Sequence, residues 1–246
     1  MTAPFPPPFL SDPTHLAATL ARQGFAVLGA EQAASLAGVD QTSLLAWRSY
    51  WNDLPPDGYL RDGGRYRRRR HSCFVLDGGQ VQQVPHRAHW QPVAYNALHG
   101  GMQRHFEPIA DAMLGQAAWS ELLAWLGRVA STLKGAQPWY TEAHQFRIDT
   151  TDGIGRPTPE GAHRDGVDLV AVFMVDRFGV KGGETRVFEA DGPSGQRFTL
   201  SQPWSVLLLD DARVIHESTP IQPLQAGGYR DTLVVTLRAG GFQAAQ

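Results

Sequence analysis

The sequence has little of what marks secreted, membrane or nucleic-acid-binding proteins. It contains a single cysteine, Cys73, so no disulfide can form within the chain, which suits a reducing cytoplasm. No apolar run approaches the roughly 20 residues that cross a bilayer, and residues 1–10 lack the basic start and apolar core of a secretory signal. The formal net charge of -2 creates no field that would attract nucleic acid or an anionic membrane. We therefore expect a cytoplasmic protein with neither nucleic-acid nor membrane partners.

The composition is that of a globular protein. Hydrophobic residues make up 42% of the chain and charged residues 19%, which argues against extensive disorder. A length of 246 residues suits one β-barrel or sandwich domain with added helices. We expect a single domain over residues 1–246, in which a mainly helical region, 1–135, braces a β core over 140–238.

The expected elements follow from hydrophobic spacing and turn residues. The first part favours helices over residues 12–23, 42–51 and 93–133, the last interrupted near Gly100-Gly101 and Gly115, with strands at 25–28 and within 63–76. The second part has short runs of strand-forming residues separated by Gly, Asp and Pro turns. These candidate strands cover residues 140–148, 169–175, 185–189, 197–200, 206–209, 214–218 and 232–237. The pattern predicts a mainly β fold with flanking helices, in the form of a barrel or a two-sheet sandwich.

A candidate metal site is formed by His163, Asp165 and His216. On an extended backbone His163 and Asp165 point to the same face, so an imidazole and a carboxylate emerge side by side. His216 lies on a later candidate strand that a barrel can bring opposite this pair. Two histidines and one carboxylate on one face of an octahedron leave positions open, which suits non-haem Fe(II). A His-x-Asp triplet alone is common by chance; the order of triplet, strands, histidine and then arginine is more specific.

Arg230 supplies the final element of that order. It lies fourteen residues after His216, at the start of the strand Asp231–Leu237, and its guanidinium can bind a carboxylate in bidentate fashion. Thr232 shares its face and could place a hydroxyl beside the same carboxylate. The alternative is that Arg230 pairs with an acidic neighbour such as Asp231 at the surface.

These residues resemble the bacterial 2-oxoglutarate/Fe(II) dioxygenases that include the free L-isoleucine 4-hydroxylase. The likeness is clearest over residues 140–238 and rests on His163-Arg-Asp-Gly-Val-Asp168, Gly182-Gly-Glu-Thr185, Val206-Leu-Leu-Leu-Asp-Asp211, Ile215-His-Glu-Ser-Thr-Pro220 and Tyr229-Arg-Asp-Thr-Leu-Val-Val-Thr-Leu237. The strand Ala143-His-Gln-Phe-Arg147 also resembles the one that precedes the metal motif in that family.

The resemblance implies a double-stranded β-helix, a jelly-roll of the cupin-like kind. It implies Fe(II) held by His163, Asp165 and His216, and 2-oxoglutarate as cosubstrate with its distal carboxylate on Arg230. It further implies dioxygen and a free aliphatic amino acid as the other reactants. The loop that follows Asp165 differs from that of the isoleucine enzyme, which leaves the identity of the substrate open.

Two further residues are candidates for binding carboxylates. Gln145 and Arg147 share one face of the strand before the metal motif, and His144 and Phe146 share the other. If the first pair faces the cavity, it could bind the 1-carboxylate of 2-oxoglutarate or a carboxylate of the substrate. The alternative is that Arg147 is a surface residue.

The run from Arg67 to Arg70 is short and lacks interleaved aromatic residues, so we interpret it as a solvated or pocket-edge strand. The histidines of the first half, including His89, have no obvious carboxylate partner in the sequence. The leading hypothesis is therefore a hydroxylase of an aliphatic C–H bond in a free amino acid or similar small molecule. The alternatives are a hydroxylase of a macromolecule on the same fold and a cupin-like metal-binding protein that is no oxygenase, which would not need Arg230.

Overall fold

The structure is a computed structural model that describes residues 10–244, so most of the N-terminal stretch considered above lies outside the described residues. The helices are α1 (Leu16–Gln23), α2 (Ala30–Ala37), α3 (Gln41–Ala46), α4 (Asp111–Leu114) and α5 (Ala117–Lys134), with 3₁₀ turns at Pro13–His15 and Trp47–Trp51. Within the described part, no helix has the length and apolar character needed to cross a membrane.

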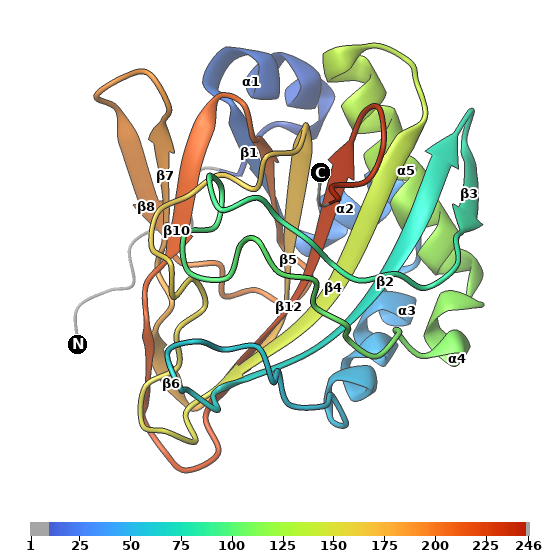
Figure 1. The fold of residues 1–246 in the computed structure, drawn as a ribbon. Helices are drawn as coiled ribbons and strands as arrows, with labels where there is room; N and C mark the ends of the chain where they lie inside the picture. The colour runs from blue at the N-terminus through green and yellow to red at the C-terminus, as the bar shows by residue number, and fades with distance from the viewer. Residues whose placement is uncertain (1–9, 245–246) are drawn as a thin grey trace.

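One large antiparallel sheet dominates the molecule (Figure 1). Its order is β1-β9-β5-β12-β4-β2-β3, where the strands are β1 (Phe25–Leu28), β2 (Arg67–Asp77), β3 (Gln80–Gln83), β4 (Trp139–Asp149), β5 (Leu169–Phe178), β9 (Val206–Asp210) and β12 (Tyr229–Arg238). A smaller sheet has the order β10-β7-β8, formed by β10 (Val214–Ser218), β7 (Thr185–Glu189) and β8 (Gly195–Phe198). The short strands β6 (Val180–Gly182) and β11 (Ile221–Pro223) pair with each other.

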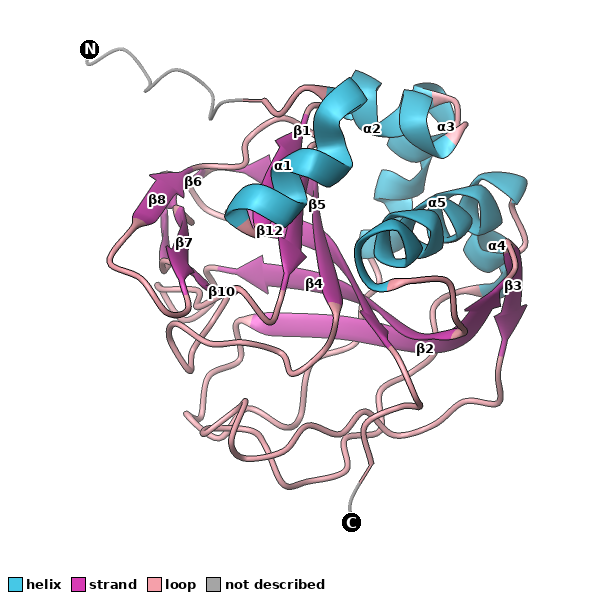
Figure 2. Cartoon of the chain, turned by 90° about the horizontal axis from the view of Figure 1, so that it is seen from above, coloured by secondary structure: helices cyan, strands magenta, loops and turns pink. Residues whose placement is uncertain are grey.

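The two faces of the large sheet have different coverings. Figure 2 shows the helices on one side of the sheet and long loops on the other. Side chains alternate along β12, so Leu233, Val235 and Leu237 join the helix-facing core while Thr232 and Val234 face a cavity. A second apolar cluster, which includes Val170, Met174, Val187 and Val214, joins the large and small sheets. The cavity therefore lies on the sheet face that the helices leave free.

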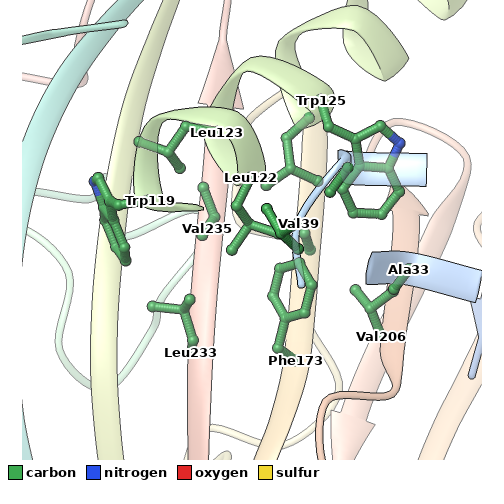
Figure 3. Close-up of a cluster of buried hydrophobic side chains, with 14 of the residues drawn as sticks. Ala33, Val39, Trp119, Leu122, Leu123, Trp125, Phe173, Val206, Leu233 and Val235 are labelled. Carbon is green, nitrogen blue, oxygen red and sulfur yellow. The ribbon is translucent and has the colours of Figure 1, made fainter. Parts of the chain in front are cut away.

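The helix-facing core has its centre under α5. Leu122, Leu123 and Trp125 of this helix lie close to Phe173, Leu233 and Val235 of the sheet (Figure 3). Apolar residues three and four apart in α5 form the stripe that the sheet buries. Trp47 and Trp204 extend the same core, with ring centroids 5.6 Å apart.

Most of the expected strands are present with ends shifted by a few residues, but the helix expected over 93–133 is wrong in its first part. Residues 93–110 contain turns and an isolated bridge between His89 and Arg104, and the helices begin only at Asp111. Pro92 and Pro108, which carry no backbone N–H, flank this segment. The Ala-rich helix α2 was absent from the expected elements, and β2 and β3 make residues 1–135 less helical than expected.

Adjacent leucines of α3 test the packing of the core. Leu44 is 1% exposed and Leu45 is 43% exposed. We expect Leu44→Ala to lower the free energy of unfolding by about 2–5 kcal/mol, because it removes buried methyl groups and leaves a cavity. Leu45→Ala should change it by less than about 1 kcal/mol. Equilibrium denaturation in urea measures both, and equal losses would contradict this packing.

Candidate functional site

His163 and His216 are brought together by a backbone bridge between distant parts of the chain. The His163 N–H donates to the His216 carbonyl at 3.0 Å, and the His216 N–H donates back at 2.9 Å. Their ring centroids lie 4.7 Å apart. Asp165 completes the group: its Oδ1 is 3.8 Å from Nε2 of His163 and its Oδ2 is 3.7 Å from Nε2 of His216. The two predicted segments thus meet at a point where three ligand atoms could hold one cation.

Hydrogen bonding orients the His163 ring, and burial keeps His216 in the neutral form. Nδ1 of His163 donates to the Gly161 carbonyl at 2.9 Å, which leaves its Nε2 free to face Asp165. Burial opposes protonation of His163, but the nearby carboxylates of Asp165 and Glu160 outweigh it and raise its pKa. Burial and the neighbouring His163 hold the pKa of His216 well below its usual value. His216 is therefore neutral, the form that binds a metal.

Asp211 orients the loop that carries Asp165. Its Oδ1 accepts the Asp165 N–H at 3.0 Å, and its Oδ2 accepts those of Gly166 at 2.8 Å and Val167 at 3.1 Å. Gly166 has φ +76°, and a Cβ there would lie 2.5 Å from the ring of Tyr95, so the turn requires glycine. Burial and the charge of Asp165 raise the pKa of Asp211 to about 6. Asp211 ends one of the sequence motifs on which the resemblance to the dioxygenases rests, but the sequence predicted no role for it.

Gln91 supports Asp165 from the opposite side. Its Nε2 donates to Asp165 Oδ1 at 3.2 Å, and its Oε1 accepts from Arg104 Nη2 at 2.8 Å and Asn96 Nδ2 at 3.3 Å. Most of these residues belong to the segment expected to be helical, and they have no motif that sequence reasoning could have detected. Only the fold brings them to the metal-binding group.

Arg230 lies in the same cavity as the three candidate ligands. The cavity has a volume of about 140 Å³, and β12 lines it with alternate residues that include Arg230, Thr232, Val234 and Thr236. Nε and Nη2 of Arg230 are buried and have no hydrogen-bond partner among residues 10–244. Burial and the nearby Arg177 lower the pKa of Arg230 to about 10, so the group remains cationic at neutral pH.

The neighbourhood of Arg230 rules out the surface pairing considered above. Arg230 is only 3% exposed. Asp231 points to the other face of the strand, where it accepts hydrogen bonds from Nε and Nη2 of Arg147 at 2.8 and 2.6 Å. Gly183 lies beside Arg230 with φ +68°, a conformation that favours glycine, and a Cβ there would lie only 3.0 Å from Cγ2 of Ile221.

The prediction that Gln145 and Arg147 face the cavity is wrong. Arg147 binds Asp231 and lies over the ring of Tyr229 at 4.2 Å, and Nε2 of Gln145 contacts Sδ of Met113. His144 and Phe146, on the alternate face, line the cavity instead. The spacing along the strand correctly separated the two pairs, but alternation alone cannot tell which face is inward.

A second polar cluster surrounds Glu142. His89 Nδ1 donates to its Oε2 at 2.7 Å, and His71 and His144 each bring Nε2 within 3.7 Å of its carboxylate. His89 thus has the carboxylate partner that the sequence did not reveal. Burial opposes the charge on Glu142, but His89 and the other imidazoles outweigh it and lower its pKa well below the usual range.

This second cluster resembles a set of metal ligands, but its details favour a hydrogen-bonded network. The rings of His71 and His144 stack at an interplanar angle of 15°, whereas one cation would have to lie in the plane of both rings. Nη2 of Arg69 donates to Nδ1 of His144 at 2.8 Å, and a guanidinium cannot accept. The proton of neutral His144 is therefore on Nε2, the atom that faces Glu142.

The cavity around His163, Asp165 and His216, by contrast, fits the iron and the 2-oxoglutarate that the sequence predicts. Two imidazole nitrogens and one carboxylate converge without a bulky group between them, which is the donor set of non-haem Fe(II). The unpartnered buried nitrogens of Arg230 provide the paired donors that a carboxylate of 2-oxoglutarate would accept.

Comparisons with known proteins agree with this geometry. A family model described as 2OG-Fe dioxygenase matches residues 48–236. The crystal structure of a bsmA homolog from Methylobium petroleophilum PM1 is 51% identical with a TM-score of 0.92, and the match covers 100% of this chain and 98% of that one. No curated protein matches the chain.

More distant solved structures share the fold. IDO from Bacillus thuringiensis is 16% identical with a TM-score of 0.76, over 94% of this chain and 97% of that one. The Fe(II)/α-ketoglutarate-dependent dioxygenase TqaL is 18% identical with a TM-score of 0.71, over 94% and 90%. At such identities the likeness speaks for the fold alone, and it confirms the predicted mainly β class of the double-stranded β-helix type.

Replacing Asp211 tests whether its hydrogen bonds to the Asp165 segment support metal binding. Asp211→Ala removes the acceptor of three backbone N–H groups, so Asp165 loses its fixed orientation. We expect the affinity for Fe(II) to fall about 10–100-fold, as for other residues that orient ligands. Anaerobic calorimetric titration measures it, with the exposed Asp191→Ala as control. Equal Fe(II) affinities in a folded Asp211→Ala protein would contradict this role.

Proposed function

Because the chain belongs to the 2OG-Fe dioxygenase family, we propose that it hydroxylates an aliphatic C–H bond of a free amino acid or a similar small molecule. Enzymes of this family use Fe(II) and 2-oxoglutarate. The observation that carries the proposal is that one cavity is lined by His163, Asp165 and His216 and by Arg230, whose Nε and Nη2 have no hydrogen-bond partner among residues 10–244.

In this proposal His163, Asp165 and His216 hold the iron. Bound Fe(II), with 2-oxoglutarate and dioxygen, supplies the oxidation of an unactivated C–H bond, coupled to conversion of 2-oxoglutarate to succinate and carbon dioxide. Arg230 binds the distal carboxylate of 2-oxoglutarate through its fork of N–H donors. Thr232, two residues along the same face, offers a hydroxyl beside that carboxylate. Asp211 and Gln91 keep the Asp165 carboxylate in its orientation.

The closure of the cavity supports a small substrate. Nε2 of Gln243 donates to the carbonyls of Asp165 and Gly166 at 3.0 and 2.9 Å, which ties the C-terminal segment over the iron ligands. The neighbouring Phe242 lines the cavity, and its ring centroid lies 5.2 Å from that of Tyr140. Phe242 and Gln243 thus form part of the cavity wall beside the proposed iron ligands, which favours a small substrate.

The lining of the cavity suits an amino acid better than a hydrocarbon. Buried arginines and the carboxylate of Glu142 lie in its walls, beside apolar side chains such as Phe146, Val172 and Val234. Charged groups in the wall favour a charged ligand, and apolar groups accommodate an aliphatic side chain. The sequence resemblance to free L-isoleucine 4-hydroxylases supports the same class.

The alternatives are less well supported. A macromolecular substrate was suggested by the charged segment Arg61–Arg70. Within it Arg61 and Arg65 are exposed, but Arg67 and Arg69 line the cavity, so the charges of these two are directed at a ligand in the cavity and not at a docking surface. A metal-binding protein without oxygenase activity would have no use for the unpartnered Arg230.

Turnover of 2-oxoglutarate tests the proposal. With Fe(II), a pool of free aliphatic L-amino acids should stimulate succinate release, and one of them should gain the mass of one oxygen atom. His216→Ala removes one of the three proposed ligands, so it should abolish both signals. Succinate release without stimulation by any amino acid would reject the proposed substrate class, and normal turnover by His216→Ala would reject the proposed ligands.

Arg230→Gln tests the binding of the cosubstrate. Loss of a charged, bidentate donor should raise the KM for 2-oxoglutarate about 10–100-fold, as expected for a lost charged hydrogen bond. Steady-state kinetics measure it, with the exposed Arg128→Gln on α5 as control. An unchanged KM would assign the distal carboxylate to another group.

A further inference from the structure

A second group of guanidiniums lies in the cavity wall. Arg67 and Arg69 alternate along β2 and face inward, whereas Arg68 on the other face is partly exposed and lies 3.5 Å from Asp149. Arg104 enters from the loop that is held by its backbone bridge to His89, through hydrogen bonds of 2.9 and 3.0 Å. The three inward side chains are 5%, 3% and 2% exposed, in the order Arg67, Arg69 and Arg104.

These three cations have too few anionic partners. In the described part of the chain, Asp57 is the only carboxylate within 4 Å of their nitrogens: Arg67 Nε lies 2.7 Å and Arg69 Nη1 3.9 Å from its Oδ2. One N–H nitrogen of each arginine is buried without a hydrogen-bond partner in the part of the chain that the structure describes, namely Arg67 Nη2, Arg69 Nε and Arg104 Nε. Buried charges without partners are costly, so this arrangement favours the binding of an anion.

Arg69 is fixed in place by its neighbours. Its guanidinium lies between the rings of Phe106 and Phe146, at 3.8 and 4.4 Å from their centroids, and its Nη2 donates to His144. It contributes charge to the site without freedom to move. Arg67 and Arg104 have fewer contacts, and Arg104 has no ion pair among residues 10–244.

This group is separate from Arg230. In the sheet, Arg230 of β12 is paired with Ile148 of β4, and Ile148 is paired with Arg67 of β2. Because neighbouring strands are about 4.8 Å apart, the backbones of the two arginines lie roughly 10 Å apart. The two arginines therefore enter the cavity from strands on either side of β4, and the wall offers positive charge from both.

The second group is also close to the proposed iron ligands. Gln91 connects them directly: it accepts from Arg104 Nη2 and donates to Asp165 Oδ1. An anion bound to Arg104 would therefore be separated from Asp165 by little more than the side chain of Gln91. If the carboxylate of a substrate binds there, the carbon atoms a few bonds along its chain lie beside the proposed iron ligands.

We propose that Arg67, Arg69 and Arg104 form the subsite that binds the carboxylate of the substrate, and that they select small aliphatic carboxylic acids. The proposal rests on the proposed function, since it names the residues that would recognise an amino acid. Arg67 and Arg104 donate to the carboxylate, and Arg69 supplies further positive charge. The aliphatic chain then extends toward His163 and His216.

The test compares three pools of compounds with Fe(II) and 2-oxoglutarate: free aliphatic L-amino acids, aliphatic monocarboxylic acids without an amine, and the primary amides of the same amino acids. Wild-type enzyme should release succinate with a carboxylate-bearing pool and at least tenfold less with the amides. Arg104→Gln should raise the KM for the active pool about 10–100-fold. It should also reduce the preference for acid over amide, a ratio that a general loss of activity would not change.

Two control measurements isolate the role of Arg104. Arg68→Gln removes an adjacent arginine from the outer face of β2 and should leave both KM and preference unchanged. The Fe(II) affinity of Arg104→Gln, measured by titration, checks that Gln91 still orients Asp165. If Arg104→Gln binds Fe(II) poorly, the acid-to-amide ratio of an Arg67→Lys variant, which keeps a cation opposite Asp57, takes its place.

The outcomes separate this inference from the proposed function. Stimulation by the monocarboxylic acids but not by the amino acids would reject the amino-acid substrate and support the subsite. Equal stimulation by amides and acids, or stimulation by no carboxylate pool, would overturn the subsite. A raised KM for 2-oxoglutarate in Arg104→Gln, with the acid-to-amide preference intact, would also overturn it, because the arginines would then serve the cosubstrate.

Discussion

The candidate site depends on one short antiparallel bridge, in which His163 and His216 exchange backbone hydrogen bonds. The two residues lie more than fifty positions apart, and strands of both sheets separate them along the chain. The bridge sets the imidazoles side by side, and the extended backbone after His163 brings Asp165 to the same face. Asp211 then holds this short segment by three backbone hydrogen bonds. Without the bridge, two histidines and a carboxylate would be separate polar residues.

The second constraint is electrostatic. Four arginines, Arg67, Arg69, Arg104 and Arg230, are buried around one cavity, and within the described residues each has a nitrogen without a hydrogen-bond partner. Folding around unpaired charges costs free energy that the apolar core under α5 and the sheet must offset. Such a cost is typical of a binding site, where the ligand supplies the missing partners. These arginines reach the cavity from β2, from β12 and from the loop that carries Arg104, so positive charge is available for an anionic cosubstrate and an anionic substrate.

Much of the β core was predictable because its strands alternate or form short apolar runs between turn residues. The strand at 185–189 has the predicted limits, and β4, β5, β9 and β12 differ from prediction by a few residues at their ends. The segment 93–110 was less predictable: its apolar residues are spaced as in a helix, but it covers the cavity as a loop and is held by Gln91, Asn96 and Arg104. Local spacing does not report these long-range hydrogen bonds, which override helix propensity.

The sequence alone determined the chemistry that is available: the His-x-Asp triplet, the later histidine and the arginine on the last strand supply imidazole, carboxylate and guanidinium groups wherever the chain places them. It also determined which residues share a face, because alternation is a property of the extended backbone. Only the tertiary structure decided which face is inward. Gln145 and Arg147 pack outside the cavity, and His144 and Phe146 line it, because the helices bury one side of the sheet and leave the other to the cavity. The roles of Asp211, Gln91 and Arg104 likewise arise from contacts between segments distant in sequence, which no local pattern records.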